Sequence, residues 1–181
     1  MDKTPIVIRP ASPQDVPSLG RLGVLMVRTH HAFDPRRFIA PAPRTAERYG
    51  AFLGEQLAKR SAVVLVAVRR ARVIGYAYAG LEGYDYMALR GPAGALYDIV
   101  VAPAHRGRGV GRLLLDAALA WLDAQGAPRA VLSTAEQNVP AQRLFARAGF
   151  RRTMIEMTRE AHGGPAPAAR AHPRSAKRSK R

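Results

Sequence analysis

A stretch near the middle of the chain constrains the fold most, because it joins an apolar run, a glycine-rich turn and a helical pattern. The apolar, β-branched run Leu96 to Val101 predicts a buried strand, and Pro103 ends it because proline lacks the N–H that a ladder bond needs. The turn is Arg106 to Gly111. Apolar residues then recur at helical spacing: Leu113, Leu114, Ala117, Ala118, Trp121 and Leu122. The stretch therefore predicts a strand, a turn and a helix in sequence.

The glycine turn predicts an anion site. Such a turn aims several backbone N–H groups at one point beside the positive end of a helix dipole, and phosphate is the usual ligand. Glycine permits positive φ and the close approach of a ligand to the backbone. Arg106, Arg108 and Arg112 add positive charge around the same point.

Two common phosphate loops do not fit this spacing. A P-loop requires Gly-Lys-Ser/Thr, but Gly111 is followed by Arg112 and Leu113. The dinucleotide fingerprint requires Gly-x-Gly-x-x-Gly and a later acid, but the three glycines of this turn are spaced two and two. The region near Arg129 also lacks an acid.

The turn instead resembles the acetyl-coenzyme A loop of the GNAT (GCN5-related) N-acetyltransferases. The matching residues are Arg106-x-x-Gly109-x-Gly111, preceded by Ile99-x-Val101-x-Pro103 and followed by Asn138-x-Pro-Ala141-x-x-Leu144-Phe145-x-Arg-x-Gly149-Phe150. The three motifs stand in the family's order and spacing, and the resemblance covers roughly Ile6 to Arg159. Three motifs are a far more specific signal than the glycine loop alone.

The resemblance implies an α/β fold over residues 1–160, with a mixed, mostly antiparallel sheet, helices on both faces and a splayed central strand pair. It also implies acetyl transfer from acetyl-coenzyme A to a primary amine by direct attack, without a metal. Main-chain N–H groups around Ile99 to Val101 could polarise the thioester carbonyl. The expected coenzyme-binding residues are Ile99, Val100, Val101, Arg106, Gly107, Arg108, Gly109, Val110, Gly111, Arg112, Asn138 and Phe145.

Tyr97 and Asp98 are the candidate catalytic residues. An amine with a pKa near 10.4 is neutral in only about one molecule per few thousand at pH 7, so a proton acceptor would help. Tyr97 stands where relatives often carry Glu or His, and Asp98 points to the opposite face if the strand is regular. The alternative is structural: Tyr97 packs the cleft wall and Asp98 caps or pairs. Relatives often carry a proton-donating Tyr where Phe145 stands, and some carry a Glu where Ser133 stands, so neither role transfers.

The acceptor side is expected to include His30, His31, Tyr84, Asp85 and Tyr86. A neutral imidazole could take the amine proton, although a surface or packing role for the histidines is the alternative. The aromatic loop could equally be a packed lid. No spaced carboxylate or thiolate set accompanies the histidines, so we expect no metal site. The acceptor, a small-molecule amine or a protein amine, stays open.

The remaining pattern predicts further elements in the following order: a strand at Ile6 to Arg9, a helix begun by Ser12 and Pro13 and ending near Arg28, a loop from Thr29 to Pro43, a helix from Thr45 to Arg60, a hairpin of Val63 to Val68 and Val73 to Tyr78, a loop from Gly83 to Gly94, a strand at Arg129 to Thr134, a helix at Pro140 to Ala148 and a last strand at Arg151 to Thr158.

Charge and composition limit the remaining possibilities. The net charge is +16, of which six units lie in residues 161–181, a basic segment without large apolar residues that we expect to be a disordered tail. The chain has no cysteine, no membrane-spanning run and no apolar leader, so we expect a cytoplasmic protein without disulfides. We allow for a homodimer and do not expect nucleic acid as a partner. The alternatives kept open are transfer of another acyl group, a non-catalytic acyl-coenzyme A or regulatory module, and a nucleic-acid binder using the basic tail.

Overall fold

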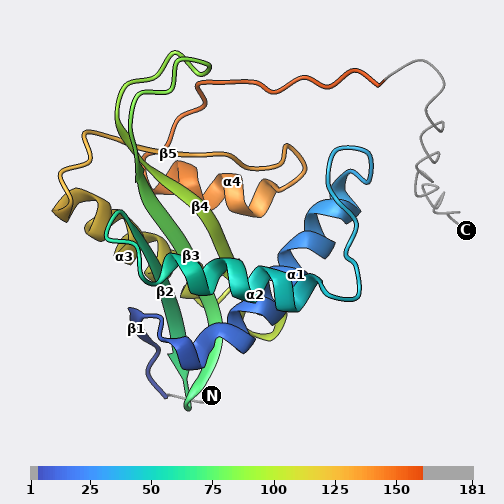
Figure 1. Cartoon of the computed structure of the whole chain (residues 1–181), viewed down its shortest axis with the longest axis vertical. Coiled ribbons are helices and arrows are strands. Elements are labelled where there is room, and N and C mark those ends of the chain that lie inside the picture. Colours follow the sequence, from blue (N-terminus) through green and yellow to red (C-terminus); the bar gives the residue numbers. More distant parts are fainter. Residues whose placement is uncertain (1–3, 161–181) are drawn as a thin grey trace, which may run out of the picture. The chain divides into compact units, whose positions relative to one another are not determined.

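One five-stranded sheet organises the computed structural model, which describes residues 4–160. Its strands lie in chain order, β1 to β4 antiparallel and β5 parallel to β4 (Figure 1). The strands are β1 (Val7–Pro10), β2 (Ala62–Arg69), β3 (Arg72–Glu82), β4 (Ala93–Val101) and β5 (Ala130–Leu132). The helices are α1 (Val16–Phe33), α2 (Thr45–Gln56), α3 (Val110–Ala124) and α4 (Val139–Arg147), with short 3₁₀ turns at Pro13–Asp15 and Pro103–His105.

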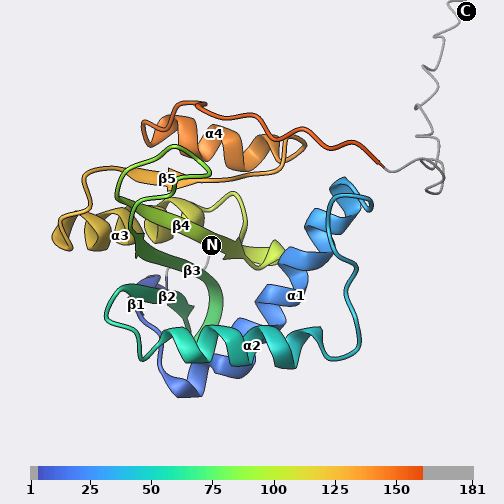
Figure 2. The ribbon, with the colours of Figure 1, turned by 45° about the horizontal axis from the view of Figure 1, so that its top comes forward.

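Helices cover both faces of the sheet, as Figure 2 shows. On one face, α1 and α2 pack Leu19 and Leu53 against Val66 and Tyr76 of the sheet. On the other face, α3 packs its apolar stripe against β2, β3 and β4, and Phe145 of α4 joins the same core. The two apolar faces follow from the alternation of side chains along each strand. The predicted α/β fold is confirmed.

The turn between β2 and β3 is a two-residue hairpin. Arg70 and Ala71 have φ values of 49° and 59°, the backbone of the turn type that matches the twist of two antiparallel strands. The predicted hairpin is confirmed, and both of its strands extend beyond the predicted ends. The residues after Glu82 form the tip of a second hairpin, in which Asp85 and Arg90 exchange backbone hydrogen bonds.

Helix α1 continues farther than predicted, to Phe33, and two side chains of its last turns contact carbonyls of the preceding turn. Thr29 Oγ1 donates to Leu25 O at 2.8 Å, and His30 Nδ1 lies 3.0 Å from Met26 O. Each bond spans four residues, as the helix does. The prediction that His30 and His31 lie in a loop was wrong, since both occupy the last turn of α1.

The predicted last strand, Arg151 to Thr158, was also wrong. Residues 151–160 have no regular secondary structure and are exposed, including Met154, Ile155 and Met157. A β-favouring sequence forms a strand only where a neighbouring strand accepts its backbone hydrogen bonds. Among the described residues, those up to Arg151 form one compact unit. The domain boundary that the sequence places after residue 160 stays a prediction. The predicted basic tail, residues 161–181, lies outside the described residues.

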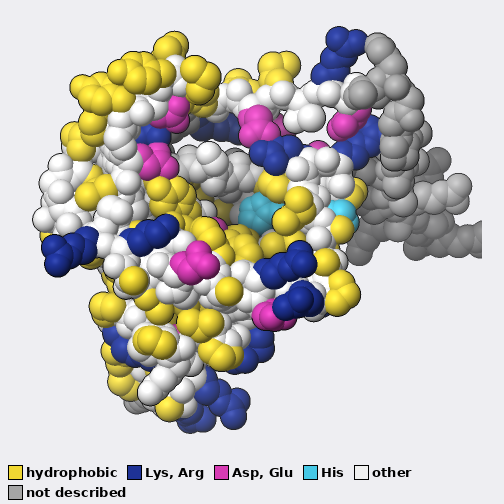
Figure 3. All heavy atoms as spheres, in the orientation of Figure 1, with side chains coloured by type: hydrophobic (Ala, Val, Ile, Leu, Met, Phe, Trp, Pro, Cys, Tyr) yellow, Lys and Arg dark blue, Asp and Glu magenta, His cyan; other side chains and the backbone are white. Residues whose placement is uncertain are grey.

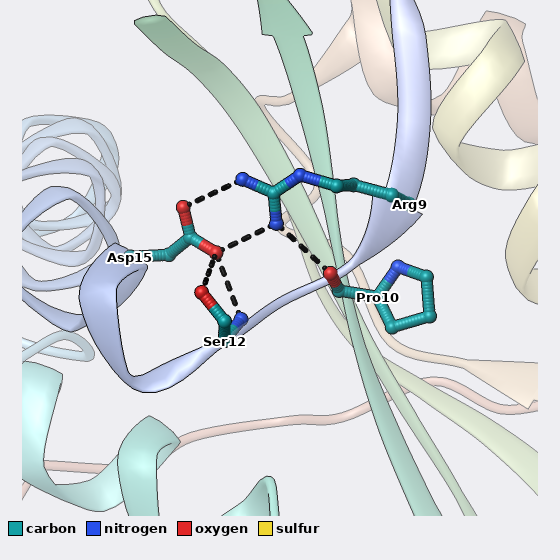
Figure 4. Close-up of polar contacts among 4 residues, drawn as sticks. All are labelled: Arg9, Pro10, Ser12 and Asp15. Atoms are coloured by element: carbon teal, nitrogen blue, oxygen red, sulfur yellow. Dashed lines mark hydrogen bonds and ion pairs between the residues drawn. The ribbon is translucent and has the colours of Figure 1, made fainter. Parts of the chain in front are cut away.

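A buried carboxylate joins β1 to the start of α1 (Figure 4). Asp15 accepts two hydrogen bonds from the Arg9 guanidinium, at 2.7 and 3.0 Å. It also accepts from the backbone N–H and the hydroxyl of Ser12, at 2.8 and 3.0 Å. The hydrogen bonds from Arg9 lower the pKa of Asp15 to about 2. The predicted helix start at Ser12 is confirmed, with a salt bridge that the sequence did not reveal.

We predict that Asp15→Asn destabilises the protein at neutral pH by roughly 1–2 kcal/mol. A full conversion of the pKa shift would give more, but Arg9 is 41% exposed and solvent screens the pair. Because the folded-state pKa is below the unfolded value of 3.8, the contribution is present above about pH 4 and disappears as the pH falls to about 2. Urea unfolding at pH 7, 4 and 2 measures it. A constant difference between wild type and variant across this range would contradict the assignment.

Candidate functional site

The candidate site lies where β4 and β5 separate. The two strands pair at only three positions, ending with Leu96 opposite Leu132, while β4 continues to Val101. Beyond Leu96 the edge of β4 that faces β5 has no strand beside it among the described residues. The predicted splayed pair is therefore present, and it leaves an opening within the sheet.

A β-bulge at Tyr97 coincides with this separation. Tyr78 pairs with Asp98 and Ala79 with Leu96, so Tyr97 is the extra residue of β4. A bulge bends the strand and increases its twist, which carries β4 away from β5. The bulge also interrupts the alternation of side chains. Tyr97 lies 4.7 Å from the Tyr78 ring, and Asp98 contacts residues of that same face, so the prediction of opposite faces was wrong.

Two backbone N–H groups point into the opening. Ala102 N–H donates to Ile74 O of β3 at 2.8 Å. Because N–H groups alternate along a strand, Val100 also faces β3, whereas Ile99 and Val101 face the opposite edge. That edge has lost β5, so these two groups are available to a bound carbonyl oxygen.

The glycine turn, called the cradle here, leaves backbone N–H groups open at the start of α3. Gly107 and Gly109 have φ values of 70° and 80°, which favour glycine, and a Cβ at either position would meet no atom within 4 Å. Gly109 is the N-cap of α3, and no side chain caps the helix. The first N–H groups of α3 therefore remain for an external acceptor, and open space adjoins them. A coenzyme pyrophosphate fits this arrangement.

The arginines of the turn have different surroundings. Arg106 Nε donates to Val101 O at 3.0 Å, which ties the turn to the end of β4. Arg112 Nε lies 2.7 Å from Asp116 Oδ1, one turn along α3, and the side chain also reaches Arg147 O. Arg108 is exposed. The cradle is thus mainly backbone, with Arg106 holding its position.

A pocket links the opening to α1 and α4. Its lining residues are Met26, His30, Leu96, Tyr97, Asp98, Ile99, Leu132, Ser133, Thr134, Asn138, Ala141 and Phe145. Asn138 is the N-cap of α4 and accepts from Ala141 N at 3.4 Å, so its structural role coexists with a place in the pocket. Phe145 is buried between the pocket and the core. Asn138 and Phe145, which the C-terminal motif predicted as coenzyme-binding residues, thus line the same pocket as residues of β4.

Asp98 is a buried carboxylate at the centre of this pocket. Its side chain accepts hydrogen bonds at Oδ2 from the hydroxyls of Tyr49, at 2.6 Å, and Tyr76, at 3.0 Å. The residue is 8% exposed, and no salt bridge to Asp98 is present among the described residues. Burial raises the pKa of Asp98 above its ordinary value, although the two hydroxyls and His30 act in the opposite direction. The same environment raises the pKa of both tyrosines.

Close packing of α1 and α2 positions Tyr49. A Cβ on Gly23 would lie 2.2 Å from the Tyr49 ring, so only glycine allows the ring to approach α1 at that level. Sequence reasoning missed Tyr49 and Tyr76. Tyr49 reaches Asp98 across 49 positions in the chain, a separation that no local motif signals. The alternation of β3 could have placed Tyr76 on the same face as Asp98 only once the strand register was known.

Tyr97 lies at the wall of the pocket. Burial and a hydrogen bond with Glu82 raise its pKa above the ordinary tyrosine value. The ring packs on Tyr78 and is partly exposed. These contacts correspond to the structural alternative, a wall of the cleft, while any contact with substrate stays a prediction.

The predicted acceptor residues are divided between two places. His30 lines the pocket, whereas His31 does not and places its Nδ1 2.9 Å from Phe38 O. Tyr84 and Tyr86 stack at 6.3 Å on the exposed hairpin tip, where Asp85 accepts from the N–H groups of Met87 and Ala88. None of these three tip residues lines the pocket. In Figure 3 this face is hollowed between the hairpin and α2, and a histidine side chain is visible beside the hollow.

No cluster of three or more side chains in residues 4–160 could hold a metal ion. Over the same residues, no helix combines the length and the apolar character that crossing a membrane requires.

Comparison with known proteins identifies a family. The model of the acetyltransferase (GNAT) family matches residues 27–150. A mycothiol acetyltransferase of Thermobispora bispora is 34% identical over 96 residues, which are 51% of this chain and 31% of that protein. The chain therefore spans about a third of the length of this curated relative.

Solved structures share the fold. A mutant of the BH1408 protein from Bacillus halodurans has a TM-score of 0.74 at 22% identity, with 86% of this chain and 99% of that chain covered. The aminoglycoside N-acetyltransferase AAC(6')-Iy in complex with CoA has a TM-score of 0.65 at 20% identity, with 89% and 97% covered. At these identities the likeness shows the fold alone.

We predict that Asp98→Asn leaves the melting temperature at pH 7 unchanged or raises it by a few degrees. Asparagine keeps an acceptor for the tyrosine hydroxyls and removes a buried charge that has no cationic partner. Because the folded-state pKa lies above 3.8, wild-type stability falls relative to the variant as the pH rises from about 4.

Asp98→Ala is the matched contrast. It removes the acceptor of both hydroxyls and should cost about 1–3 kcal/mol. Calorimetric melting of the three proteins from pH 4 to 8 measures both effects. A loss in Asp98→Asn as large as that in Asp98→Ala would show that the charge stabilises the fold.

Proposed function

The chain belongs to the GNAT acetyltransferase family, and from this premise we propose that it transfers an acetyl group from acetyl-coenzyme A to a primary amine. The observation that carries the proposal is a pair of features that the hydrogen bond from Arg106 Nε to Val101 O ties together. The uncapped start of α3 offers N–H groups for a pyrophosphate, and the separated edge of β4 offers the N–H groups of Ile99 and Val101. A coenzyme bound along this line would bring its thioester to the pocket that contains Asp98.

The acetyl carbonyl would lie at the β4 edge. As the amine attacks, negative charge grows on the carbonyl oxygen, and fixed backbone dipoles in a water-poor site stabilise that charge at little reorganisation cost. The bulge at Tyr97 shifts the strand register and bends β4 away from β5. The N–H groups on the edge of β4 that faced β5 are therefore left without a partner strand among the described residues. Asn138 and Phe145 would bound the cleft on the α4 side.

The leaving thiol needs no protein acid at Phe145. A thiol has a pKa near 8.5, so its anion is a tolerable leaving group near neutral pH, and solvent can supply the proton. The hydroxyl that many relatives carry at this position is absent here, and Phe145 instead packs on Phe150 at 6.0 Å. We propose that Phe145 acts through packing and coenzyme affinity.

The acceptor is proposed only as a class. The pocket contains one ionisable carboxylate, Asp98, and no lysine or arginine among its described lining residues. The whole chain has a net charge of +16, but the described part of this pocket has no basic lysine or arginine to repel a cation. We propose that it accepts a positively charged or neutral amine. The mycothiol acetyltransferase is matched over only 31% of its length, so its acceptor is not assigned to this chain.

We predict that Gly109→Glu weakens coenzyme A binding by about 100-fold or more, because a carboxylate would enter the phosphate cradle and like charges cost several kcal/mol. Gly126→Glu is the matched control. Gly126 has φ +74°, also faces open space and follows the other end of α3, so the variant has the same charge and similar backbone strain. Isothermal calorimetry measures affinity, and thermal melting compares the two folds.

One outcome would contradict the coenzyme site, and another would contradict the catalytic activity. Equal weakening in both variants would mean that charge or strain, not the cradle, is responsible. Normal coenzyme binding without product from any amine in a screen of small and peptide amines would favour a non-catalytic acyl-coenzyme A binding module.

A further inference from the structure

His30 is the only histidine among the described residues that line the pocket, and three contacts fix its ring. Nδ1 lies 3.0 Å from the Met26 carbonyl oxygen, and the rings of Phe33 and Phe38 lie 5.9 and 5.0 Å away in edge contacts. The ring therefore cannot turn without losing a hydrogen bond and two aromatic contacts. A side chain held by its own helix and by two rings is suited to a fixed role.

The hydrogen bond at Nδ1 determines which nitrogen can accept a proton. A carbonyl oxygen only accepts, so Nδ1 carries the hydrogen in this contact. In the neutral ring, Nε2 then holds the lone pair. Met26 O thus leaves Nε2 as the basic atom of a residue that lines the pocket.

Asp98 is less suited than His30 to receive the amine proton itself. Its Oδ2 already accepts from two tyrosine hydroxyls, and the residue is almost fully buried. Asp98 and His30 line the same pocket.

The charged and titratable groups around His30 come from several elements. The pocket itself contributes Tyr97 and Asp98 of β4, and Asp98 in turn holds Tyr49 of α2 and Tyr76 of β3. After α1, Arg37 lies over the Phe38 ring, 5.0 Å from its centre, on which His30 also packs. The neighbour His31 bonds to Phe38 O. The α4 side contributes Asn138, Ala141 and Phe145, which do not titrate.

We propose that His30 is the proton acceptor of the transfer reaction, an inference that rests on the proposed function. The neutral amine nitrogen bonds to the thioester carbonyl carbon, and its surplus proton passes to His30 Nε2. The C–S bond breaks, and its electron pair stays on sulfur. The thiolate then takes a proton from the imidazolium or from solvent, which restores the neutral ring. Asp98 keeps its hydrogen bonds with Tyr49 and Tyr76 and takes no part in the proton transfer.

The test compares His30→Gln with His31→Gln, its neighbour on the same helical turn. The substrate is the best amine found in a screen of the wild-type enzyme. We expect His30→Gln to lower kcat about 10²–10⁴-fold near pH 7, the usual loss when a general base is removed. The loss should shrink at high pH, where solvent base replaces the ring, and the acidic limb of the wild-type pH profile should disappear. His31→Gln should keep the wild-type profile.

A second variant guards against a folding defect. His30→Phe retains a ring for the contacts with Phe33 and Phe38 but cannot accept a proton, so it should melt like wild type and still lose kcat. Coenzyme A affinity, measured by calorimetry, should be unchanged in all three variants. A wild-type kcat and pH profile in His30→Gln, or an equal loss in His31→Gln, would overturn the assignment while leaving acetyl transfer established. Absence of transfer by wild type itself would overturn the proposed function and this inference together.

Discussion

Strand β4 bonds to β5 through three residue pairs and then continues beside β3 alone, without β5, for the five residues from Tyr97 to Val101. A strand edge inside a folded protein normally has its N–H and C=O groups satisfied, because an unpaired buried backbone group costs as much as a lost hydrogen bond. Here the bulge at Tyr97 bends the strand at the last shared pair. The open edge, the pocket and the access of α4 to the sheet all depend on this separation.

Helices on both faces of the sheet place residues beside the separated strands. On one side, α3 begins at Val110 after its N-cap Gly109, and Arg106 bonds the turn to Val101 at the end of β4. On the other side, α1 and α2 deliver His30 and Tyr49 to Asp98. A buried carboxylate bound by hydroxyls rather than by a cation is a poor device for stability. The pocket that it lines also contains His30.

The parts of the fold with local signals could be predicted from the sequence. The Ser12 helix start, the Arg70-Ala71 hairpin and the strand before Pro103 depend on residues within a few positions of one another. The prediction of the glycine turn at the start of α3 is confirmed for the same reason. Gly107 and Gly109 have positive φ, a backbone conformation that favours glycine, so the sequence itself indicates the turn.

The rest depended on contacts that residue order does not encode. The bulge arises from the pairing of β4 with β3, so the faces of Tyr97 and Asp98 could not be read from alternation. Helix α1 continues through His30, whose ring contacts Met26 O, so this residue lies on a helix and not in the predicted loop. The β-like segment after Arg151 remained without regular structure because strand formation needs a partner. Tyr49 and Tyr76 became functional candidates only through their bonds to Asp98.

The central claim is that a coenzyme lies along the open edge of β4 and ends at the start of α3. The most direct measurement is a two-dimensional amide NMR titration with coenzyme A and then acetyl-coenzyme A. The account predicts large shifts for the amides of Ile99, Val101 and Val110 to Arg112, and small shifts for Val100, whose N–H faces β3. Shifts confined to other elements, with the amides of Ile99 and Val101 unmoved at saturation, would contradict it.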